Sequence, residues 1–415
     1  MSGNIFARGA AKTLAAVVET TYGVAPTTGG QLLRRTGSSL NPIVQEIDSQ
    51  EILSSQQMRD SRQGPRQVQG QLDGYLAPAT YQILMENLLR STFAAGASIS
   101  SVTDGVLTIT APTGGNAGSI TLAGSSENFL TSGFKVGDIV RLSGDTSPAT
   151  ADSGVNLLTT GVSANLLTFA YEPSMVGFTT GQTIGVAVYG KKLLIPSLLT
   201  AQNVGSLTFE HWYSDVGVSE VSTGCRVTSM ALNVPPAGFA TFQSQILGQS
   251  FSYSNTQLLP NAAPESTNTL LTATNGKLIY KGVPIAIVTG FSLTVAQAAM
   301  AQPVVGSNTV PNVFVGTFHV DGQFTALMIA DSMTADFLTE QEFTLALEMT
   351  TADSPSSDFV QIFLPRVKLT SETKNDSDRE ITRSFGFIAL EQAVLGGTGL
   401  AYDDTTIVIQ DSLAA

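Results

Sequence analysis

The stretch TGSSL at residues 36–40 recurs as TGFSL at residues 289–293, and VQGQL at residues 68–72 recurs as VDGQF at residues 320–324. Both signatures appear in the same order and at nearly the same spacing. Such a recurrence indicates an internal duplication, which must be recognised before any local interpretation because it sets the architecture. We therefore expect two copies of one structural unit in this chain.

One copy is much longer than the other. A strand-like segment follows each pair of signatures, SLTFEHW from Ser206 and EFTLALEM from Glu342. In the first copy 135 positions separate Leu72 from Leu207, whereas only 19 separate Phe324 from Phe343 in the second. The difference predicts a long insertion within the first copy.

Composition favours several β-rich domains. The chain has 415 residues, of which 42% are hydrophobic, and 39 glycines. This length exceeds what one core usually supports, and short Val, Ile and Thr runs bounded by Gly, Asn, Asp or Pro are typical of strands. We predict a mainly β fold with two tandem units of β-sandwich or barrel type, each with a flanking helix, plus one inserted small β domain.

The duplication and the local composition predict the domain boundaries. We expect an N-terminal arm at 1–30, a discontinuous first unit at 31–96 and 191–251, an inserted domain at 97–190, a linker at 252–275 and a second unit at 276–415. The arm is interpreted as a segment that docks on a neighbouring subunit.

Each copy contains a helical pattern after its second signature. Apolar residues at helical spacing follow Pro78, namely Tyr81, Leu84, Met85, Leu88 and Leu89, and Arg90 suits a helix C-terminus. The second copy has a weaker pattern at Ile329, Met333 and Phe337. We expect both helices to pack on a sheet.

The inserted block has several strand-like runs and predicts a small β-barrel or sandwich. Its FKVGD turn at Phe134–Asp138 is similar to small barrel modules, some of which bind RNA. The insertion has more acidic than basic residues, with Lys135 and Arg141 against Asp104, Glu127, Asp138, Asp145, Asp152 and Glu172. Nucleic-acid modules need the opposite balance, so we interpret the insertion as an outward decoration.

Net charge narrows the function classes. The chain has 20 Lys and Arg against 33 Asp and Glu, a net charge of −13. Such a surface repels phosphate and anionic headgroups, which argues against sequence-reading DNA contacts and membrane-surface binding. No run approaches the roughly 20 apolar residues of a membrane span, so we expect a soluble, unprocessed protein.

We find little support for an enzyme. The two histidines, His211 and His319, lie in different copies, and the single cysteine, Cys225, has no motif around it. Neither a metal-ligand spacing, a nucleophile elbow nor a phosphate loop is present, so we expect no catalytic residue, metal or cofactor. His211 beside Trp212 suggests a packed or interface aromatic cluster, and Cys225 a buried thiol. Two acidic residues could still converge in the folded chain.

The ordered elements resemble the tail tube proteins of bacteriophages with long, non-contractile tails of the siphovirus type. The resemblance rests on ETTYG (Glu19–Gly23), a TxSSL-like strand, a polar loop, VQGQL, a helix, then SLTFEHW and RVTSMAL. It covers about residues 15–95 and 200–250, and more faintly 277–390.

The resemblance implies a structural virion protein, assembled in the host cytoplasm, that polymerises as stacked rings into the hollow conduit for DNA. In that family the inner sheet of each unit joins its neighbours around a lumen, the loop between the early strands contacts the adjacent ring, and the arm reaches across subunits. Two units per chain imply a trimeric, pseudo-sixfold ring. Implied partners are other copies of the chain and the tape measure, tail terminator and distal tail proteins, while DNA passes without specific binding.

Two sets of candidate residues follow. The polar stretch 46–67 predicts an inter-ring loop with the charged residues Glu46, Asp48, Glu51, Arg59, Asp60, Arg62 and Arg66. Alternation along the strands predicts Glu46, Asp48, Asp73 and Asp321 as lumen-facing carboxylates.

A second hypothesis is a surface-exposed, β-rich decoration or host-binding protein whose inserted domain recognises a glycan or a protein. Self-assembly into hollow tubes would favour the tube hypothesis, and persistent monomers with glycan affinity would favour this one.

Overall fold

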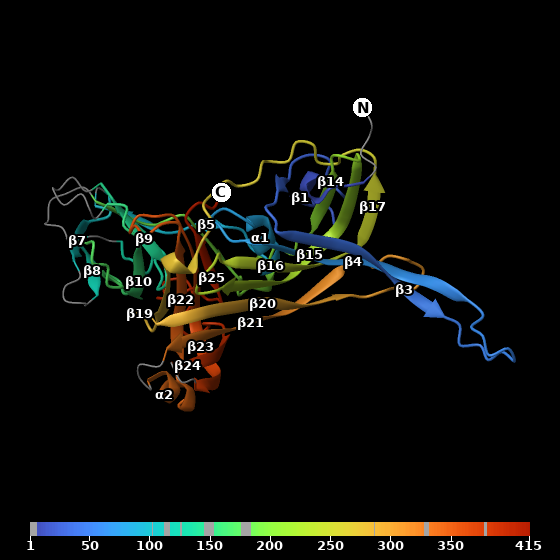
Figure 1. The fold of residues 1–415 in the computed structure, drawn as a ribbon. Helices are drawn as coiled ribbons and strands as arrows, with labels where there is room; N and C mark the ends of the chain where they lie inside the picture. Colours follow the sequence, from blue (N-terminus) through green and yellow to red (C-terminus); the bar gives the residue numbers. More distant parts are fainter. Residues whose placement is uncertain are drawn as a thin grey trace.

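The computed structural model describes residues 6–101, 103–111, 117–124, 127–144, 153–175, 184–285, 287–327, 332–376 and 380–415. The predicted mainly β fold is confirmed: two duplicated units, each with a short helix, and an inserted β domain account for the described residues. In Figure 1 the inserted domain lies at one end of the molecule and a long hairpin projects from the other.

The first copy contains eight strands and one α-helix among its described residues. They are β1 (Lys12–Val18), β2 (Gln31–Leu32), β3 (Gly37–Asp48), β4 (Ser61–Tyr75), α1 (Gln82–Leu89), β14 (Leu207–Tyr213), β15 (Val218–Val234), β16 (Thr241–Gly248) and β17 (Ser250–Ser254), with a 3₁₀ turn, η1 (Gly9–Ala11), before β1. Of these, β3 and β4 form the long hairpin.

The second copy repeats this order. It consists of β18 (Gly276–Tyr280), β19 (Val283–Ile285), β20 (Val288–Ala301), β21 (Val313–Leu327), α2 (Ser332–Leu338), β22 (Phe343–Thr350), β23 (Phe359–Asp376), β24 (Ile381–Ala389) and β25 (Val408–Asp411), preceded by η4 (Ala273–Asn275). Each element occupies the position of its counterpart in the first copy, from β1 and β18 to β17 and β25.

The pairing irregularities repeat as well. Register shifts occur at three equivalent places in the two copies. In the hairpins they lie at Val44/Glu46 in the first copy and Gln297/Ala299 in the second. The other two places are Leu207/Phe209 with Phe343/Leu345, and Val227/Ser229 with Leu369/Ser371. Bulges re-aim the side chains of a strand and are features of a particular fold. Their agreement shows that the duplication extends to the backbone register and fixes which residues of the two copies correspond.

The glycine of the second signature has the same packing reason in both copies. A Cβ atom on Gly70 would overlap the carbonyl oxygen of Ser39, and one on Gly322 would overlap that of Ser292. Ser39 and Ser292 are themselves equivalent residues of the first signature. The two signatures recur together because they form one close strand contact.

One sheet passes through both copies, and we name it the hairpin sheet. Its strand order is β3–β4–β16–β15–β20–β21–β24–β23, with every neighbouring pair antiparallel. The copies meet within it where Ser229–Val234 of β15 pairs with Phe291–Ala296 of β20. The early hairpins of both copies therefore belong to one continuous surface.

Two smaller layers pack against the hairpin sheet. The first has the order β2–β1–β14–β15–β17, and the second has the order β19–β18–β22–β23–β25, extended by β13 (Lys191–Leu194) and β5 (Ala94–Ala95). Long strands β15 and β23 cross from these layers into the hairpin sheet. The main core lies between the layers and includes Leu14, Leu72, Leu293, Phe324 and Leu345.

The helices pack on this core as the sequence predicts. In α1 the side chains of Leu84, Met85, Leu88 and Leu89 are buried, and Arg90 caps its C-terminus with φ of 57°. In α2, Met333 and Phe337 contact the same core. Ile329, the third residue of the predicted pattern, lies outside the described residues.

The inserted domain has its own sheet and core. The strand order is β6 (Ser98–Ser100), β12 (Gly185–Val188), β9 (Ile139–Ser143), β10 (Leu157–Val162), β11 (Leu166–Phe169), β8 (Gly118–Ala123) and β7 (Val106–Thr110), and a 3₁₀ turn, η3 (Leu199–Ala201), follows the domain. Although the insertion interrupts the first copy, its stem strands β5 and β13 extend the sheet of the second copy.

The insertion packs on the second copy through the FKVGD turn. Val136 and Ile139 form an apolar cluster with Ile279, Phe359 and Phe363, residues of β18 and β23. In the first copy, the equivalent side of β1 is covered by Leu258 and Leu259 of the predicted linker, which contact Ala15 and Val17. Thus both copies have an apolar outer side that another segment covers.

Two predicted segments also contribute strands or packing. Residues Lys12–Val18 of the predicted arm pair with β14, and the segment around Leu259 packs as just described.

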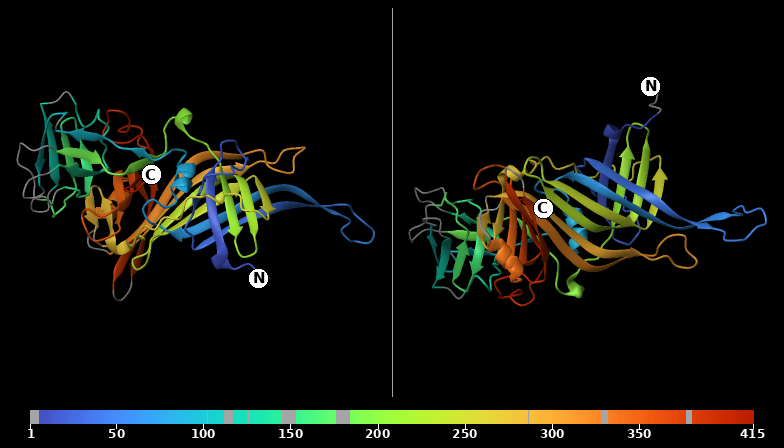
Figure 2. Two further views of the ribbon diagram at one scale, coloured as in Figure 1. Left: turned by 90° about the horizontal axis from the view of Figure 1, so that it is seen from above. Right: turned by 60° about the horizontal axis from the view of Figure 1, so that its bottom comes forward.

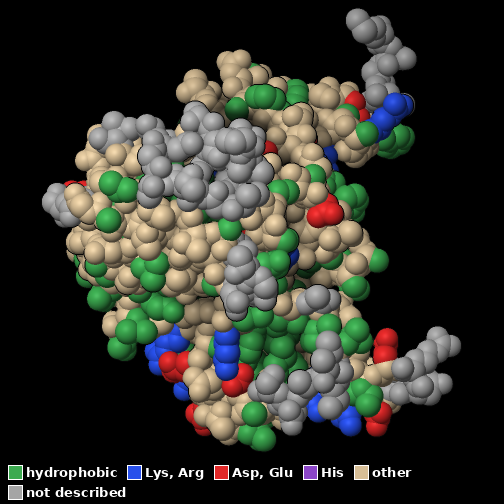
Figure 3. Space-filling model, turned by 90° about the vertical axis from the view of Figure 1, so that its left-hand side faces the viewer, with side chains coloured by type: hydrophobic (Ala, Val, Ile, Leu, Met, Phe, Trp, Pro, Cys, Tyr) green, Lys and Arg blue, Asp and Glu red, His purple; other side chains and the backbone are tan. Residues whose placement is uncertain are grey.

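Figure 3 views the side that carries the inserted domain, where charged side chains are sparse and gather mainly near the lower end. Among the described residues, no helix has the length and apolar character of a membrane-spanning segment.

Candidate assembly interface

The two long hairpins are the most prominent features of the surface. Figure 2 shows that β3–β4 and β20–β21 extend to the same side of the molecule, with β3–β4 reaching further. The shorter hairpin supports the longer one, because the Arg66 backbone N–H donates to the Asn308 carbonyl oxygen at 2.7 Å. The projecting tip is therefore the loop between Asp48 and Ser61.

Every residue predicted for the inter-ring loop lies on this projecting hairpin. Glu46 and Asp48 end β3, Glu51, Arg59 and Asp60 lie in the loop, and Arg62 and Arg66 lie on β4, all of them exposed. Two ion pairs form within it, Arg59–Glu51 at 3.0 Å and Arg62–Asp60 at 3.3 Å. Because their side chains are 58–83% exposed, solvent screens both pairs and they add little stability to an isolated chain.

One face of the hairpin sheet contacts the core and the other is polar. Core-facing positions such as Leu72, Leu232 and Phe324 alternate with polar ones. We define the polar face by the alternate positions: Ser39, Asn41, Gln69, Gln71, Asp73, Ser229, Asn233, Thr241, Gln243, Gln245, Ser292, Thr294, His319, Asp321, Gln323, Thr325, Thr373, Asn375, Thr382 and Ser384. The same register also places Arg226, opposite Leu247, and Lys368, opposite Ile388, on this side of the sheet. Arg226 is buried, and Lys368 Nζ lies 3.5 Å from Glu342 Oε1.

Two of the four predicted lumen carboxylates belong to the polar face. Asp73 accepts hydrogen bonds from Gln243 Nε2 at 2.7 Å and from Gln71 Nε2 at 3.0 Å, whereas Asp321 is exposed between Thr294 and Ile388. Glu46 and Asp48 lie on the projecting part of β3, beyond the bulge. The structure thus separates the four residues into two places on the same surface.

The hairpin sheet ends in two unpaired edges. In the part of the chain that the structure describes, β3 pairs only with β4, and residues 371–376 of β23 pair only with β24. Exposed edges present unpaired backbone donors and acceptors, which makes them sites for pairing with another chain. Six strands separate these two edges, so they lie at opposite ends of the sheet.

A polar cluster lies at the β3 edge. His211 Nε2 lies 3.1 Å from Ser38 Oγ, and Lys12 Nζ donates to the Ser38 carbonyl oxygen at 3.0 Å. Arg35 donates to the carbonyl oxygens of Gly9 and Lys12. Burial, reinforced by the charges of Lys12 and Arg35, lowers the pKa of His211 to about 3, so this histidine is neutral at physiological pH.

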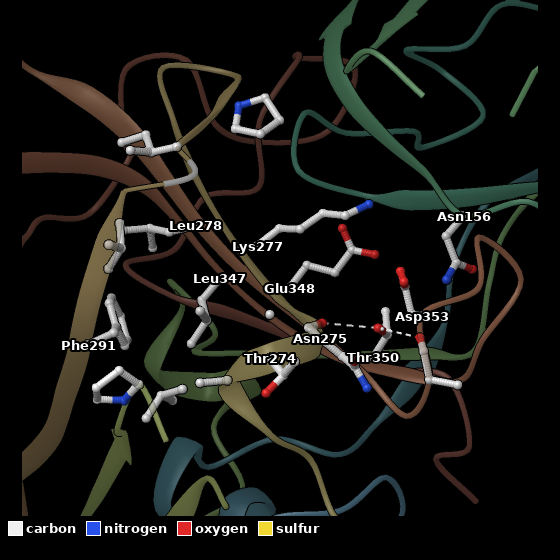
Figure 4. A pocket seen from close by; sticks show the side chains of 18 of the residues that line it. Asn156, Thr274, Asn275, Lys277, Leu278, Phe291, Leu347, Glu348, Thr350 and Asp353 are labelled. Carbon is white, nitrogen blue, oxygen red and sulfur yellow. Dashed lines mark hydrogen bonds between the residues drawn. The ribbon is translucent and has the colours of Figure 1, made fainter. Parts of the chain in front are cut away.

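A pocket of about 730 Å³ lies near the contact between the two copies and the inserted domain. Figure 4 shows apolar side chains on one side of it, including Phe291, Leu278 and Leu347, and polar ones on the other, including Lys277 and Glu348. Burial raises the pKa of Glu348 above its usual range, although Lys277 opposes this effect. These apolar residues of the second copy stand at the position that the polar cluster occupies in the first copy.

The ETTYG motif fixes the segment between β1 and β2. The buried Glu19 carboxylate accepts hydrogen bonds from Ser206 Oγ at 2.5 Å, Thr208 Oγ1 at 2.7 Å, and the backbone N–H groups of Gly23 and Gly224 at 2.7 and 2.8 Å. Charge-assisted hydrogen bonds of this kind are stronger than neutral ones. The motif is therefore a structural anchor in this fold.

The remaining candidates do not form a catalytic arrangement. His319 is exposed on the polar face of the hairpin sheet, whereas His211 is buried in β14 of the first smaller layer, and Cys225 is a buried free thiol. The described residues contain no group of three or more His, Cys, Asp or Glu side chains placed to hold a metal ion. Sequence reasoning missed Lys12 and Arg35: Arg35 lies two residues before β3, but only folding brings Lys12 to the same place.

Comparison with known proteins gives one informative match. The search of curated proteins found nothing similar to this chain. A model of the family described as phage tail tube protein matches residues 9–389, which include the first copy, the insertion and the second copy as far as the end of β24. The repeated hairpins, the continuous sheet and this nearly full-length match lead to one conclusion: the chain belongs to the phage tail tube protein family and is a structural component of the virion.

Proposed function

We propose that three copies of this chain close into a ring and that the rings stack into the hollow tube of a long, non-contractile tail, through which DNA passes during ejection. The observation that carries the proposal is the continuous hairpin sheet, which has a polar face, a core-packed face and two unpaired edges. Joining edge to edge around a ring removes both exposed edges at once. Two units per chain then provide six units from three chains.

The polar face supports a role as the lumen wall. It presents amides, hydroxyls and the carboxylates of Asp73 and Asp321, while the cations on the same side are buried, as Arg226 is, or paired with a carboxylate, as Lys368 is with Glu342. Phosphate groups meet little unpaired positive charge on such a wall, so DNA can slide without being retained. Passage rather than binding is the proposed relation to DNA.

The projecting hairpin is the proposed contact between rings. Its tip extends beyond the sheet, and Glu51, Arg59, Asp60 and Arg62 there form only exposed ion pairs with other described residues. These side chains remain free to exchange partners with the next ring. At the ends of the tube, the same surfaces would meet the tail terminator and distal tail proteins, and the lumen would hold the tape measure protein during assembly in the host cytoplasm.

The inserted domain is proposed to lie outside the tube. It packs on the side of β18 and β23 that faces away from the main core, and the hairpin sheet lies on the other side of that core. Deleting residues 98–189 would uncover Ile279, Phe359 and Phe363. We expect a deletion variant with polar replacements at these three positions to form tubes, and a soluble, folded variant without tubes would contradict the outward placement.

Cryo-electron microscopy of the purified chain tests the main proposal. We expect hollow tubes whose rings contain three chains with pseudo-sixfold symmetry. Rings of six whole chains would overturn the stoichiometry. A chain that remains monomeric at high concentration and binds glycans would instead support a decoration or host-binding role.

A further inference from the structure

The junction between the two copies is a template for the junction between chains. Residues of β15 and β23 correspond through their bulges, as do residues of β20 and β3. Within the chain, Val234 pairs with Phe291 at one end of the junction and Ser229 pairs with Ala296 at the other. The residues of β23 and β3 that correspond to these four lie on the two unpaired edges. The internal junction therefore defines the register in which these two edges would pair.

We infer that Asp376 of one chain enters the polar cluster of Lys12, Arg35 and His211 at the β3 edge of the next chain. This inference rests on the proposed ring and specifies its contact. The template gives six residue pairs between β23 of one chain and β3 of its neighbour: Ser371–Ile43, Glu372–Pro42, Thr373–Asn41, Lys374–Leu40, Asn375–Ser39 and Asp376–Ser38.

The polar cluster of the first copy occupies the place that the apolar wall of the pocket occupies in the second copy. No strand of the described chain pairs beside the polar cluster at the β3 edge. Phe291, Leu347 and Val288 line that pocket next to Val234. Ser38, His211 and Arg35 stand at the corresponding places in the first copy, and Asp376 corresponds to Val234. The apolar residues that meet inside the chain thus correspond to polar residues in the first copy. Three of these polar residues lie at the β3 edge, and the fourth, Asp376, lies on the β23 edge.

The charges of the cluster favour an incoming carboxylate. No carboxylate lies within ion-pair distance of Lys12 or Arg35 in the described part of the chain. The carboxylate of Glu220 accepts a hydrogen bond from the Tyr213 hydroxyl at 3.1 Å and lies 3.9 Å from His211 Nδ1. Burial, together with the charge of Arg35, lowers the pKa of Lys12, as expected where cations outnumber anions. Asp376 is exposed, and no ion pair joins it to another residue that the structure describes.

Backbone geometry at the β3 edge agrees with this pairing. The Arg66 N–H points away from β3, toward Asn308. In a regular antiparallel ladder the backbone groups of Val44, opposite Arg66, therefore point outward, as do those of Leu40 and Ser38. Pro42 has the same orientation and offers no donor, so the ladder between chains has one hydrogen bond fewer than the internal one. Side-chain contacts such as that of Asp376 then matter more for specificity.

A charge-exchange experiment tests the ionic contact. We expect Asp376→Lys to raise the critical concentration for tube assembly about 10-fold or more, because it places like charges together. Adding Arg35→Glu to that variant should restore assembly to within about 3-fold of wild type. Glu391→Lys makes the same charge change at an exposed site away from both edges and should assemble as wild type. Normal assembly of Asp376→Lys would overturn the ionic contact.

A cross-linking experiment tests the register independently of the charges. In the variant Ser38→Cys/Asp376→Cys, the two new thiols belong to opposite edges and can bridge only between chains, at a Cα separation that antiparallel pairing makes suitable for a disulfide. We expect covalent dimers and trimers after mild oxidation, and none from the off-register variant Ser38→Cys/Ser371→Cys. Equal cross-linking by both variants, or by neither, would overturn the register.

The outcomes separate this inference from the proposed function. A wild-type chain that never assembles overturns both. Rings of six chains that still show charge rescue and in-register cross-links overturn the three-chain ring and leave the junction supported. Rings of three chains that show neither charge rescue nor in-register cross-links support the three-chain ring and overturn the proposed junction.

Discussion

Removing the ammonium group of Lys192 should destabilise the chain strongly, because this residue joins the inserted domain to the second copy. Lys192 Nζ lies 2.7 Å from Asp138 Oδ1 in the FKVGD turn and 3.0 Å from Asp403 Oδ2. The side chains of Lys192 and Asp138 are only 10% and 2% exposed. Breaking a buried ion pair on one side leaves an uncompensated charge and costs about 3–5 kcal/mol. We expect a loss of this size for Lys192→Met.

The pH dependence of this loss has a definite sign. Burial raises the pKa of Asp138 to about 6, although the charge of Lys192 acts to lower it. A carboxyl group whose folded pKa exceeds its unfolded value destabilises the fold as pH rises through the folded pKa. Without Lys192 that pKa rises further, so the carboxyl group is protonated to a greater extent at pH 5 than at pH 8. The variant's deficit should therefore be smaller at pH 5.

Urea unfolding of the unassembled chain at both pH values measures the effect. Arg59→Met is the matched control, because Arg59 Nη1 also lies 3.0 Å from a carboxylate oxygen, Glu51 Oε2, but the two side chains are 65% and 58% exposed. An exposed pair is worth about 0–1 kcal/mol, so the control should lose little. If Lys192→Met loses no more than the control, or its deficit grows at pH 5, the argument from burial fails.

Three further predictions concern other parts of the molecule. Glu19→Gln should cost about 1–3 kcal/mol in urea unfolding, because an amide cannot accept all four hydrogen bonds, whereas the exposed Glu265→Gln should be neutral. Replacing residues 49–60 with a short turn should give isolated rings in electron micrographs, and unchanged long tubes would contradict the inter-ring role. Asp73→Lys with Asp321→Lys should leave tubes intact but slow DNA ejection, more so at low salt; ejection at the normal rate, with both lysines shown to line the lumen, would argue against electrostatic sliding.

Local sequence determined the elements whose signals lie within a few residues. The duplication was legible because the strand contact at Gly70 and Gly322 demands the same residues in both copies. The helical face of α1 and the polar alternation around Asp73 and Asp321 follow from periodicities of 3.6 and 2, which a single segment displays by itself. Low charge on the polar face could likewise be anticipated from composition.

Only the tertiary structure decided which distant segments meet. Nothing local in Lys12–Val18 marks it as the partner of β14, and nothing in the insertion shows that its stem extends the sheet of the other copy. Pairing between β15 and β20 and the burial of Asp138 with Lys192 and Asp403 are likewise contacts between segments far apart in the chain. Such contacts depend on packing across the whole core, whose energy is shared among many residues and leaves no pattern in any one stretch of sequence.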